Sequence, residues 1–528
     1  MKKLAILHII SCCVFFMSYS QLAKTYKLDS GWSSPLPRSN TINDILIRKD
    51  SLWFGTEDGL SLTMNAGTSW TNFSNTETFD NKGISAIAMN DNILWVATGY
   101  SIKLNGESVQ TGGGLHYSTD HGTSWTFIPQ PVDKGTVDTL MYGNNKIRTL
   151  AITVPQQNIT FDIALTKNTV WIASWAGMLR KSTDQGNTWT RVVLPPDNLD
   201  SINASMSLNF AFELSPVGKI YTINGKTDTL AENNNHKLFS VYASDDSTIW
   251  VGTANGINKS VDGGVSWRKF THQNQTQSIS GNFVVALKEQ RWKNRRILWA
   301  ATINANDTSE IKGVSYSENA GETWKTTLLG EWAHNISVND SGNIVYVATD
   351  NGVFRSSDAG ESWTKSGSIS DATNLQRFVS SECYAVGAKG DTVWIGGPEG
   401  IAYTIDSLPP KQFGSTWHIL RTAEQVGNKN FTYAFPNPFA PSNEPVRLHY
   451  SVHVNNSITQ DVSIRIFDYA MLPVRTLIQK ASRFSGKEYD EIWNGRNDKS
   501  SIVANGVYFY RVEIGDQSPL WGKILVLR

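Results

Sequence analysis

A short tryptophan motif, repeated along most of the chain, constrains the fold more than any other feature of the sequence. Each copy consists of Trp or Tyr, an apolar residue, a small residue and usually Thr. The seven copies begin at Trp53, Trp95, Trp171, Trp250, Trp299, Tyr346 and Trp394. A unit that recurs in this way cannot bury its apolar face alone, so successive units are expected to pack against each other and share a continuous core.

A second motif follows each copy of the first and is typical of a tight β-hairpin. It reads Ser/Thr-x-Asp/Asn-x-Gly-x-Ser/Thr-Trp, and its last copy is stretched by an insertion before Gly414. The Asp or Asn side chain is expected to accept hydrogen bonds from backbone N–H groups one or two residues on, and the Gly supplies a residue with positive φ. We predict a structural role for the turn residues, which are Asn65, Asp120, Asp184, Asp262, Asn319, Asp358 and Asp406.

The hairpin motif resembles the Asp-box of sialidase-type propellers, sortilin-like receptors and some glycan hydrolases. The first repeat divides into short strands over 42–47, 52–56, 60–63 and 69–73, and four strands per repeat is the pattern of a propeller blade. We therefore predict an all-β chain with a seven-bladed β-propeller. The repeated indoles are expected to pack between blades, because each buries on the order of 200 Å².

Two intervals between copies of the first motif are longer than one blade requires. They run from Trp95 to Trp171 and from Trp171 to Trp250, and their excess lies at 131–160 and 195–236. The second excess contains a segment, 218–221, that reads as a degenerate strand. An eighth blade is therefore the alternative to seven.

The N-terminus has the pattern of a secretory signal peptide. Two lysines precede an apolar run over 4–17, and Ser18 and Ser20 place small residues before a cleavage point. We predict a signal peptide over 1–20, a propeller over 21–426, a linker over 427–430 and a C-terminal domain over 431–528. No other apolar stretch approaches the roughly 20 residues of a membrane span.

The C-terminal segment alternates apolar and polar residues in short runs, which indicates a β-sandwich. Its motifs, in order, are Phe435-Pro436-Asn437-Pro438-Phe439, the runs 462–468 and 493–498, and the runs 505–511 and 522–528. This order resembles the immunoglobulin-like domain of flagellar hook-capping proteins. It is also similar to the C-terminal sorting domains of the type IX secretion system, although the chain ends in a single Arg528 rather than a Lys-rich tail. The resemblance implies an Ig-like domain that engages secretion machinery.

Charge and cysteine content argue against several classes of function. The whole chain has 47 basic and 47 acidic residues, and no broad basic face is apparent in the sequence, so nucleic acid is not an expected partner. Cys12 and Cys13 would leave with the signal peptide, so only Cys383 remains and no disulfide framework is expected. The His residues show no metal-ligand spacing, and we predict neither a metal nor another cofactor.

Loops at one face of a propeller surround the central channel, and their residues are the candidates for a site. The candidate ligand-binding residues are Trp175, Asn255, Trp332, His334 and Arg377, and the candidate carboxylates of a hydrolase are Glu57, Asp58, Asp350 and Glu399. A retaining or inverting glycosidase needs two carboxylates across one bond. The arginine triad and the Phe/Tyr-Arg-Ile-Pro segment expected of sialidases are not found.

Two functions therefore remain open. The favoured interpretation is a secreted or cell-surface propeller that binds an extracellular glycan or protein ligand and is exported with the help of its C-terminal domain. The alternative is an extracellular glycoside hydrolase that uses paired carboxylates at the propeller mouth.

Overall fold

The computed structural model divides the chain into two compact units, Met1–Thr422 and Ala423–Arg528. The residues that the structure describes are 24–27, 32–34, 36–73, 79, 82–91, 93–135, 139–149, 151–212, 220–223, 226–229, 233–305, 307–373, 376–406, 413–421, 430–442, 444–452 and 458–527. The predicted signal peptide lies outside this part, as does the predicted linker except for Asn430. The predicted boundary at 426 falls four residues after the structural one.

The N-terminal unit contains seven antiparallel sheets of at least four strands each among its described residues. The innermost strands are β3 (Ile42–Arg48), β7 (Gly83–Asn90), β13 (Thr160–Leu165), β21 (Leu238–Ala243), β25 (Phe283–Trp292), β29 (Ala333–Val338) and β33 (Ala385–Lys389). The second strands are β4 (Ser51–Thr56), β8 (Ile93–Leu104), β14 (Val170–Ser174), β22 (Ile249–Thr253), β26 (Arg295–Ile303), β30 (Val345–Thr349) and β34 (Thr392–Gly397). Each second strand carries one copy of the tryptophan motif.

The outer half of each sheet is the hairpin that the second motif predicts. The third strands are β5 (Gly59–Thr63), β9 (Glu107–Ser118), β15 (Met178–Ser182), β23 (Gly256–Ser260), β27 (Gly313–Ser317), β31 (Gly352–Ser356) and β35 (Gly400–Ile405). The outer strands are β6 (Trp70–Phe73), β10 (Ser124–Ile128), β16 (Thr190–Arg191), β24 (Trp267–Phe270), β28 (Lys325–Thr327), β32 (Thr364–Lys365) and β36 (His418–Leu420). The four strands predicted for the first repeat match β3 to β6 within two residues at each end.

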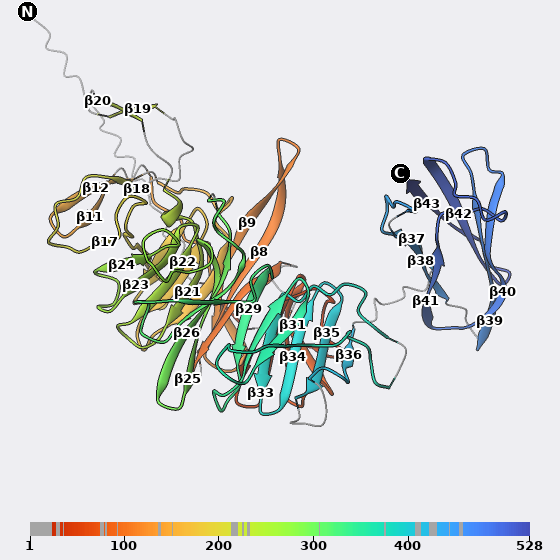
Figure 1. Cartoon of the computed structure of the whole chain (residues 1–528), viewed down its shortest axis with the longest axis horizontal. Helices are drawn as coiled ribbons and strands as arrows, with labels where there is room; N and C mark the ends of the chain where they lie inside the picture. The colour runs from red at the N-terminus through yellow and green to blue at the C-terminus, as the bar shows by residue number, and fades with distance from the viewer. Residues whose placement is uncertain are drawn as a thin grey trace, which may run out of the picture. The chain divides into compact units, whose positions relative to one another are not determined.

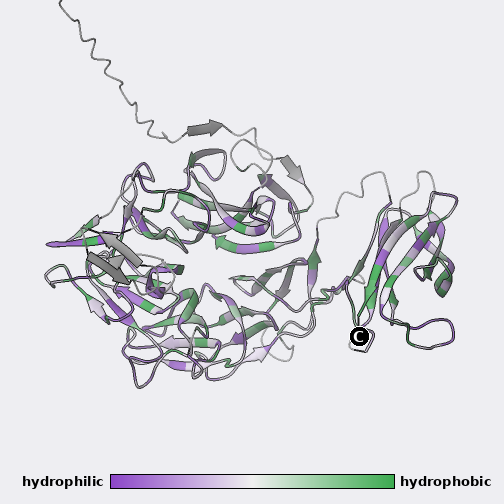
Figure 2. Cartoon of the chain, turned by 90° about the horizontal axis from the view of Figure 1, so that it is seen from above, coloured by the Kyte–Doolittle hydropathy of each residue, from purple (hydrophilic) through white to green (hydrophobic). Residues whose placement is uncertain are grey.

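The seven sheets are arranged around a common centre, which makes the fold propeller-like (Figures 1 and 2). Innermost strands of consecutive sheets contact each other, and β33 of the seventh sheet contacts β3 of the first. The first and seventh sheets also share a core that contains Ile42, Phe54 and Trp394. The ring of sheets is therefore continuous.

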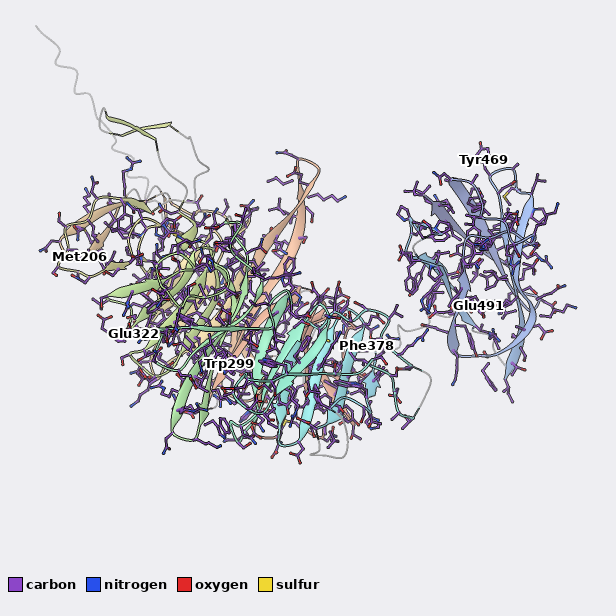
Figure 3. The ribbon with its side chains drawn as sticks, viewed as in Figure 1. Met206, Trp299, Glu322, Phe378, Tyr469 and Glu491 are labelled. Carbon is purple, nitrogen blue, oxygen red and sulfur yellow. The ribbon has the colours of Figure 1, made fainter. Side chains whose placement is uncertain are left out.

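Packing between sheets explains why the two motifs occur together. The glycine of each of the first six hairpins lies against aromatic side chains of the preceding sheet, at a positive φ. A Cβ at Gly264 would lie 2.6 Å from Trp171, and one at Gly360 would lie 2.6 Å from Trp299. A larger residue at these positions would displace the neighbouring indole, so the hairpin glycine and the tryptophan of the preceding repeat form one contact. Figure 3 shows Trp299 within the unit.

The excess segments do not add a further four-stranded sheet to the described residues. β11 (Thr139–Tyr142) and β12 (Asn145–Thr149) form a small sheet with β18 (Ala211–Phe212), and β19 (Ile220–Ile223) pairs with β20 (Lys226–Thr229). The segment 218–221, read as a degenerate blade strand, lies only partly in the described residues, and its strand β19 pairs with β20 alone. A single turn of 3-10 helix, η1 (Asn234–His236), precedes the fourth sheet.

Three sheets gain a fifth, outermost strand. β1 (Lys24–Lys27) pairs with β10, β2 (Trp32–Ser34) pairs with β6, and β17 (Ser201–Ile202) pairs with β24. In the second sheet, residues 99–114 extend β8 and β9 into a long hairpin with its tip at Asn105-Gly106 (Figure 1).

The C-terminal unit consists of two sheets that enclose one core. One sheet has the order β37 (Thr432–Phe435), β38 (Val446–Val452), β41 (Lys487–Trp493). The other has the order β40 (Pro473–Phe484), β39 (Thr459–Phe467), β42 (Gly506–Ile514), β43 (Leu520–Val526). Apolar residues from both sheets, including Leu448, Ile464 and Val512, are fully buried in a core made only of residues from this unit.

His449 in this unit provides a test of the sheet's electrostatics. It lies on β38, and its two ring nitrogens are 2.9 Å from Asp490 Oδ1 and 3.0 Å from Glu488 Oε2, both on β41. Burial alone would lower the pKa of His449, but hydrogen bonds and charges from Asp490 and Glu488 overcome it and raise the pKa to about 9.

We expect His449→Gln to destabilise the C-terminal unit at pH 6 by about 1–2 kcal/mol and to have little effect at pH 10. Because the folded pKa exceeds the unfolded value of about 6.5, the contribution is complete below pH 6.5 and is lost as pH rises through 9. Urea unfolding of residues 423–528 at several pH values measures this. An equal loss of stability at pH 6 and pH 10 would show that His449 acts by packing alone.

Candidate functional site

The loops between second and third strands and the connections between sheets share one end of the N-terminal unit, which we call the mouth. The hairpins of the second motif share the opposite end. This division follows from the antiparallel order of strands in each sheet. All nine candidate site residues lie in mouth loops or at the start of an innermost strand, whereas the Asp and Asn turn residues lie at the other end.

Six of the innermost strands have a β-bulge near their start. The bulge inserts one extra residue per sheet and changes the direction of its side chain. The register shifts at Asn43, Ser85, Phe161, Phe239, Val285 and His334. A bulge of this kind re-aims a side chain at a sheet's edge. Rings from successive innermost strands then contact each other, with Phe161 and Phe239 centroids 6.0 Å apart and Phe239 and Phe283 centroids 5.7 Å apart.

Trp175 joins this aromatic arc. It follows β14, and its ring centroid lies 5.3 Å from that of Phe239. The ammonium group of Lys237 lies 5.3 Å from the Trp175 ring centroid, which is cation–π distance. These rings are half-buried, so their remaining faces are open to solvent. The arc spans the third, fourth and fifth sheets.

Three of the predicted residues lie together in the sixth sheet and in the connection that leads into it. We call this group the Trp332 cluster. His334 Nε2 lies 2.5 Å from Asp350 Oδ1, and the rings of Trp332 and His334 stack with centroids 6.3 Å apart. The backbone N–H of Asp350 donates to the Trp332 carbonyl at 3.1 Å, which ties the two loops together. The Trp332 side chain is 41% exposed. This is a large exposed fraction for an apolar side chain that has neighbours on both sides.

Two further residues, Tyr384 and Lys312, complete the Trp332 cluster. The ring of Tyr384 meets His334 edge-on at 5.6 Å, and the ammonium of Lys312 lies 5.5 Å from the Trp332 ring. Burial, followed by the hydrogen bond to the Glu382 carboxylate, raises the pKa of Tyr384, so its hydroxyl stays protonated at neutral pH. The cluster thus combines an exposed indole with donors, acceptors and one cation.

The other candidate carboxylates are each held by local partners. The Ser39 hydroxyl donates to Glu57 at 2.9 Å, and Asp58 forms an ion pair with Arg38 at 2.8 Å. Glu399 accepts the backbone N–H of Val379 and of Ser380 and is paired with Arg421. Each of these three carboxylates is therefore bound to groups in neighbouring loops of its own sheet.

The last two candidates have different surroundings. Arg377 is exposed, and its backbone carbonyl accepts a hydrogen bond from Arg421 at 3.0 Å. Asn255 lines a polar pocket between the fourth and fifth sheets, together with Asn234, Gln273 and Asp307. Of the nine candidates, the structure therefore brings Trp332, His334 and Asp350 into one cluster and leaves the others apart.

The hairpin residues form one repeated hydrogen-bond pattern. In six copies the backbone N–H four residues on donates to the turn side chain at 2.8–2.9 Å, rather than the N–H one or two residues on. The longer reach arises because the preceding Ser or Thr hydroxyl occupies the inside of the turn and accepts the Gly N–H. The six residues are Asn65, Asp120, Asp184, Asp262, Asn319 and Asp358.

Electrostatics within these hairpins fit a structural role. Partial desolvation opposes ionisation, but hydrogen bonds from the Ser or Thr four residues on and from the Ser two residues before hold four pKa values below their ordinary range. These belong to Asp120, Asp184, Asp262 and Asp358.

Asp406 differs from the other turn residues. Its carboxylate accepts hydrogen bonds from Tyr346 at 2.6 Å and from Arg355 at 2.5 Å, both in the preceding sheet. Residues 407–412, which follow Asp406, lie outside the described residues. Within the described part of the chain, Asp406 links the sixth and seventh sheets through its buried ion pair with Arg355.

Two acidic residues on innermost strands escaped the sequence analysis. Asp44 and Asp162 directly follow bulged residues, and each accepts a backbone N–H from the next sheet, Ile87 and Val241 respectively, at 2.9 Å. Burial raises the pKa of Asp44 to about 6 and that of Asp162 to about 7. The sequence feature that could have revealed them is an acidic residue inside a strand that is otherwise buried. Their hydrogen bonds join consecutive sheets.

The described residues contain no group of three or more His, Cys, Asp or Glu side chains arranged to hold a metal ion. No helix in that part of the chain is long and apolar enough to cross a membrane.

Comparison with known proteins finds only remote structural similarity. No protein-family model and no curated protein matches the sequence. YCF48 from Cyanidioschyzon merolae is 15% identical, with 71% of this chain and 98% of that chain covered and a TM-score of 0.42. The extracellular domain of the one-component system BT4673 of B. thetaiotaomicron is 12% identical, with 92% and 74% covered and a TM-score of 0.28.

A third structure has a similar degree of likeness. PorZ, a surface component of the type-IX secretion system of Porphyromonas gingivalis, is 14% identical, with 92% of this chain and 87% of that chain covered and a TM-score of 0.22. Similarities this remote carry neither a site nor an activity over to this chain.

Proposed function

We propose that this protein is an exported, seven-bladed β-propeller of the Asp-box type that binds an extracellular glycan or protein ligand at its mouth. The observation that carries the proposal is the Trp332 cluster, where an indole that is 41% exposed stands beside fixed polar groups. Leaving this much apolar area in water costs free energy, at about 25 cal/mol per Å². Such exposed aromatic side chains beside polar groups are typical of binding sites.

The arrangement of the cluster supports binding of a ligand with both an apolar face and polar edges. Trp332 offers a flat face, while Lys312, His334 and Asp350 offer a cation, a ring nitrogen and a carboxylate. Hydrogen bonding within the cluster fixes these groups before a ligand arrives, which lowers the entropy cost of binding. The aromatic arc from Trp175 to Phe283 extends a similar surface along the mouth.

The partners of the carboxylates favour binding over hydrolysis. A glycosidase needs one carboxyl group to donate a proton and a second to attack or to activate water across the same bond. Glu57, Asp58 and Glu399 each already accept hydrogen bonds or ion pairs from their own loops. Asp350 is directed toward His334. We therefore propose a binding protein rather than an enzyme.

The C-terminal unit is proposed as an Ig-like module for sorting or attachment. Its two sheets enclose a core of their own, as an independent module requires. Together with the signal peptide predicted for residues 1–20, such a module supports a proposed site of action outside the cell, either secreted or at the outer surface.

Trp332→Ala tests the proposed function. We expect it to weaken ligand retention by roughly 10- to 100-fold, as loss of a central interface tryptophan does. The purified chain is screened against immobilised polysaccharides and extracellular proteins, and retention is measured together with release of reducing sugar. Trp521→Ala is the matched control, because Trp521 is 44% exposed and also lies beside an arginine, Arg511, in the C-terminal unit.

Two results would contradict the proposal. Retention of the identified ligand that is unchanged by Trp332→Ala would remove the Trp332 cluster from the site. Reproducible release of reducing sugar that Glu399→Gln abolishes would show that the protein is a hydrolase.

A further inference from the structure

A polar pocket with a volume of ≈ 490 Å³ lies at the mouth between the fourth and fifth sheets. We call it the amide pocket. Its polar walls come from η1, the β22–β23 turn, the β24–β25 connection and the β26–β27 loop, through Asn234, Asn255, Gln273, Asn282, Asp307 and Glu310. The volume is within the range of small-ligand sites, and the pocket lies outside the Trp332 cluster.

The chemistry of the walls selects a polyhydroxylated ligand. Four of the lining side chains are carboxamides. Gln273 and Asn282 already donate their side-chain N–H groups to protein acceptors, whereas the carboxamide of Asn255 and the hydroxyl of Thr308 can both donate and accept hydrogen bonds. Sugar hydroxyl groups have the same dual capacity. The lining contains no aromatic or large aliphatic side chain, so it offers little to an apolar ligand.

The floor of the pocket is held rigid by a buried carboxylate. Glu310 is 6% exposed and accepts the backbone N–H of Asn282 at 3.0 Å and of Ala305 at 2.7 Å. It also accepts the side-chain amides of Asn282 at 2.8 Å and Gln273 at 3.1 Å. Because these bonds fix the amides in place, a ligand would not have to order them.

Other lining groups are left for a ligand. The Asn255 backbone N–H donates to Thr253 Oγ1 at 3.0 Å, which fixes the turn, but its carboxamide makes no hydrogen bond to the described residues. The hydroxyl of Thr308, which also lines the pocket, likewise has no hydrogen-bond partner among them. The carboxamide of Asn255 and the hydroxyl of Thr308 can therefore donate to and accept from a ligand.

The charges that line the pocket disfavour acidic ligands, although the ammonium of Lys237 lies behind the lining, 3.0 Å from Asn234 Oδ1. The lining includes two carboxylates and neither Lys nor Arg. The backbone N–H and hydroxyl of Ser309, followed by the amide of Gln273, hold the pKa of Asp307 at about 2. Asp307 is therefore anionic at any physiological pH, and a carboxylate or sulfate on the ligand would be repelled.

The amide pocket and the Trp332 cluster share one loop. The β26–β27 loop carries Asp307 and Glu310, and it ends at Lys312, whose ammonium lies beside Trp332. A ligand longer than one sugar could therefore follow this loop from the pocket to the indole.

We infer that the amide pocket binds one neutral sugar residue of a glycan, and that the adjoining sugar residues extend toward Trp332. This inference rests on the proposed function and specifies the class of ligand that the mouth binds.

Calorimetric titration of the purified chain tests the inference. The probes are four neutral tetrasaccharides (of glucose, mannose, xylose and N-acetylglucosamine) and acidic tetragalacturonate. We expect at least one neutral probe to bind and the acidic one to bind at least about 10-fold more weakly. Asn255→Ala and Thr308→Val should each weaken binding by about 3- to 10-fold, as loss of one hydrogen bond does. Asn187→Ala, an exposed amide in a hairpin at the opposite end, should change it by less than about 2-fold.

The outcomes separate this inference from the proposed function. Binding that responds to Trp332→Ala but not to Asn255→Ala or Thr308→Val overturns the amide pocket and leaves the proposed function standing. Binding that responds to the pocket variants alone supports the pocket and contradicts the role of Trp332. Binding of the acidic probe only, or of no glycan while a protein ligand is retained through Trp332, also overturns the pocket.

Discussion

Trp267→Ala is expected to lower the free energy of unfolding of the N-terminal unit by about 3–5 kcal/mol. Trp267 ends the hairpin motif of the fourth sheet, is 2% exposed and shares a core with Trp171 of the third sheet. Removing its indole leaves a cavity between two sheets that rigid strands on both sides cannot close. Urea unfolding followed by circular dichroism measures the change as a lower midpoint at constant slope.

A matched substitution distinguishes the stability lost through packing from any effect of simply removing a tryptophan. Trp332→Ala removes the same side chain from an exposed position and is expected to change stability by less than about 0.5 kcal/mol. Equal effects of the two substitutions, or an unchanged midpoint for Trp267→Ala, would show that the repeated indoles do not hold the sheets together.

Deletion of residues 423–528 is expected to leave the N-terminal unit folded while surface display falls by at least about 10-fold. The first expectation follows from the cores, since the apolar cluster of the C-terminal unit contains residues of that unit alone. Independent cores unfold independently. The second expectation follows from the proposed sorting role, because a truncated chain would cross the inner membrane and then remain in the periplasm.

Protease shaving of cells of the native host, followed by detection of the protected and exposed chain, measures display. The unfolding midpoint of the truncated unit is the control, since a misfolded chain would also fail to reach the surface. Equal display of full-length and truncated chains with equal stability would refute a sorting function for residues 423–528.

Local patterns predicted the four-stranded repeats closely because their physics is local. The strand limits of the first repeat and the hairpin turns depend on residues within a few positions of each other. The long excess segments were less predictable. Whether 131–160 and 195–236 formed a blade depended on whether they could pair with a neighbouring sheet, and periodicity within a segment does not contain that information.

The candidate site also contains some residues that local patterns could place and others that only the tertiary structure brought together. Trp332, His334 and Asp350 could be placed at the mouth from strand order, but Tyr384 and Lys312 come from the two neighbouring sheets and meet them only because the sheets form a ring. The hydrogen bond from Gln273 to Glu310 joins residues more than 30 positions apart, and no pattern in the sequence indicated it.

The sequence by itself determined that this protein is built from repeated four-stranded sheets with a separate β-rich C-terminal segment. Repetition, alternating polarity and turn residues act over short distances, and each repeat carries them in full. Only the tertiary structure decided which polar side chains face each other. The placement of Tyr384 beside His334 and of Asp406 beside Arg355 depends on contacts between sheets. Such contacts join residues far apart in the chain, and their geometry is set by packing of the whole ring.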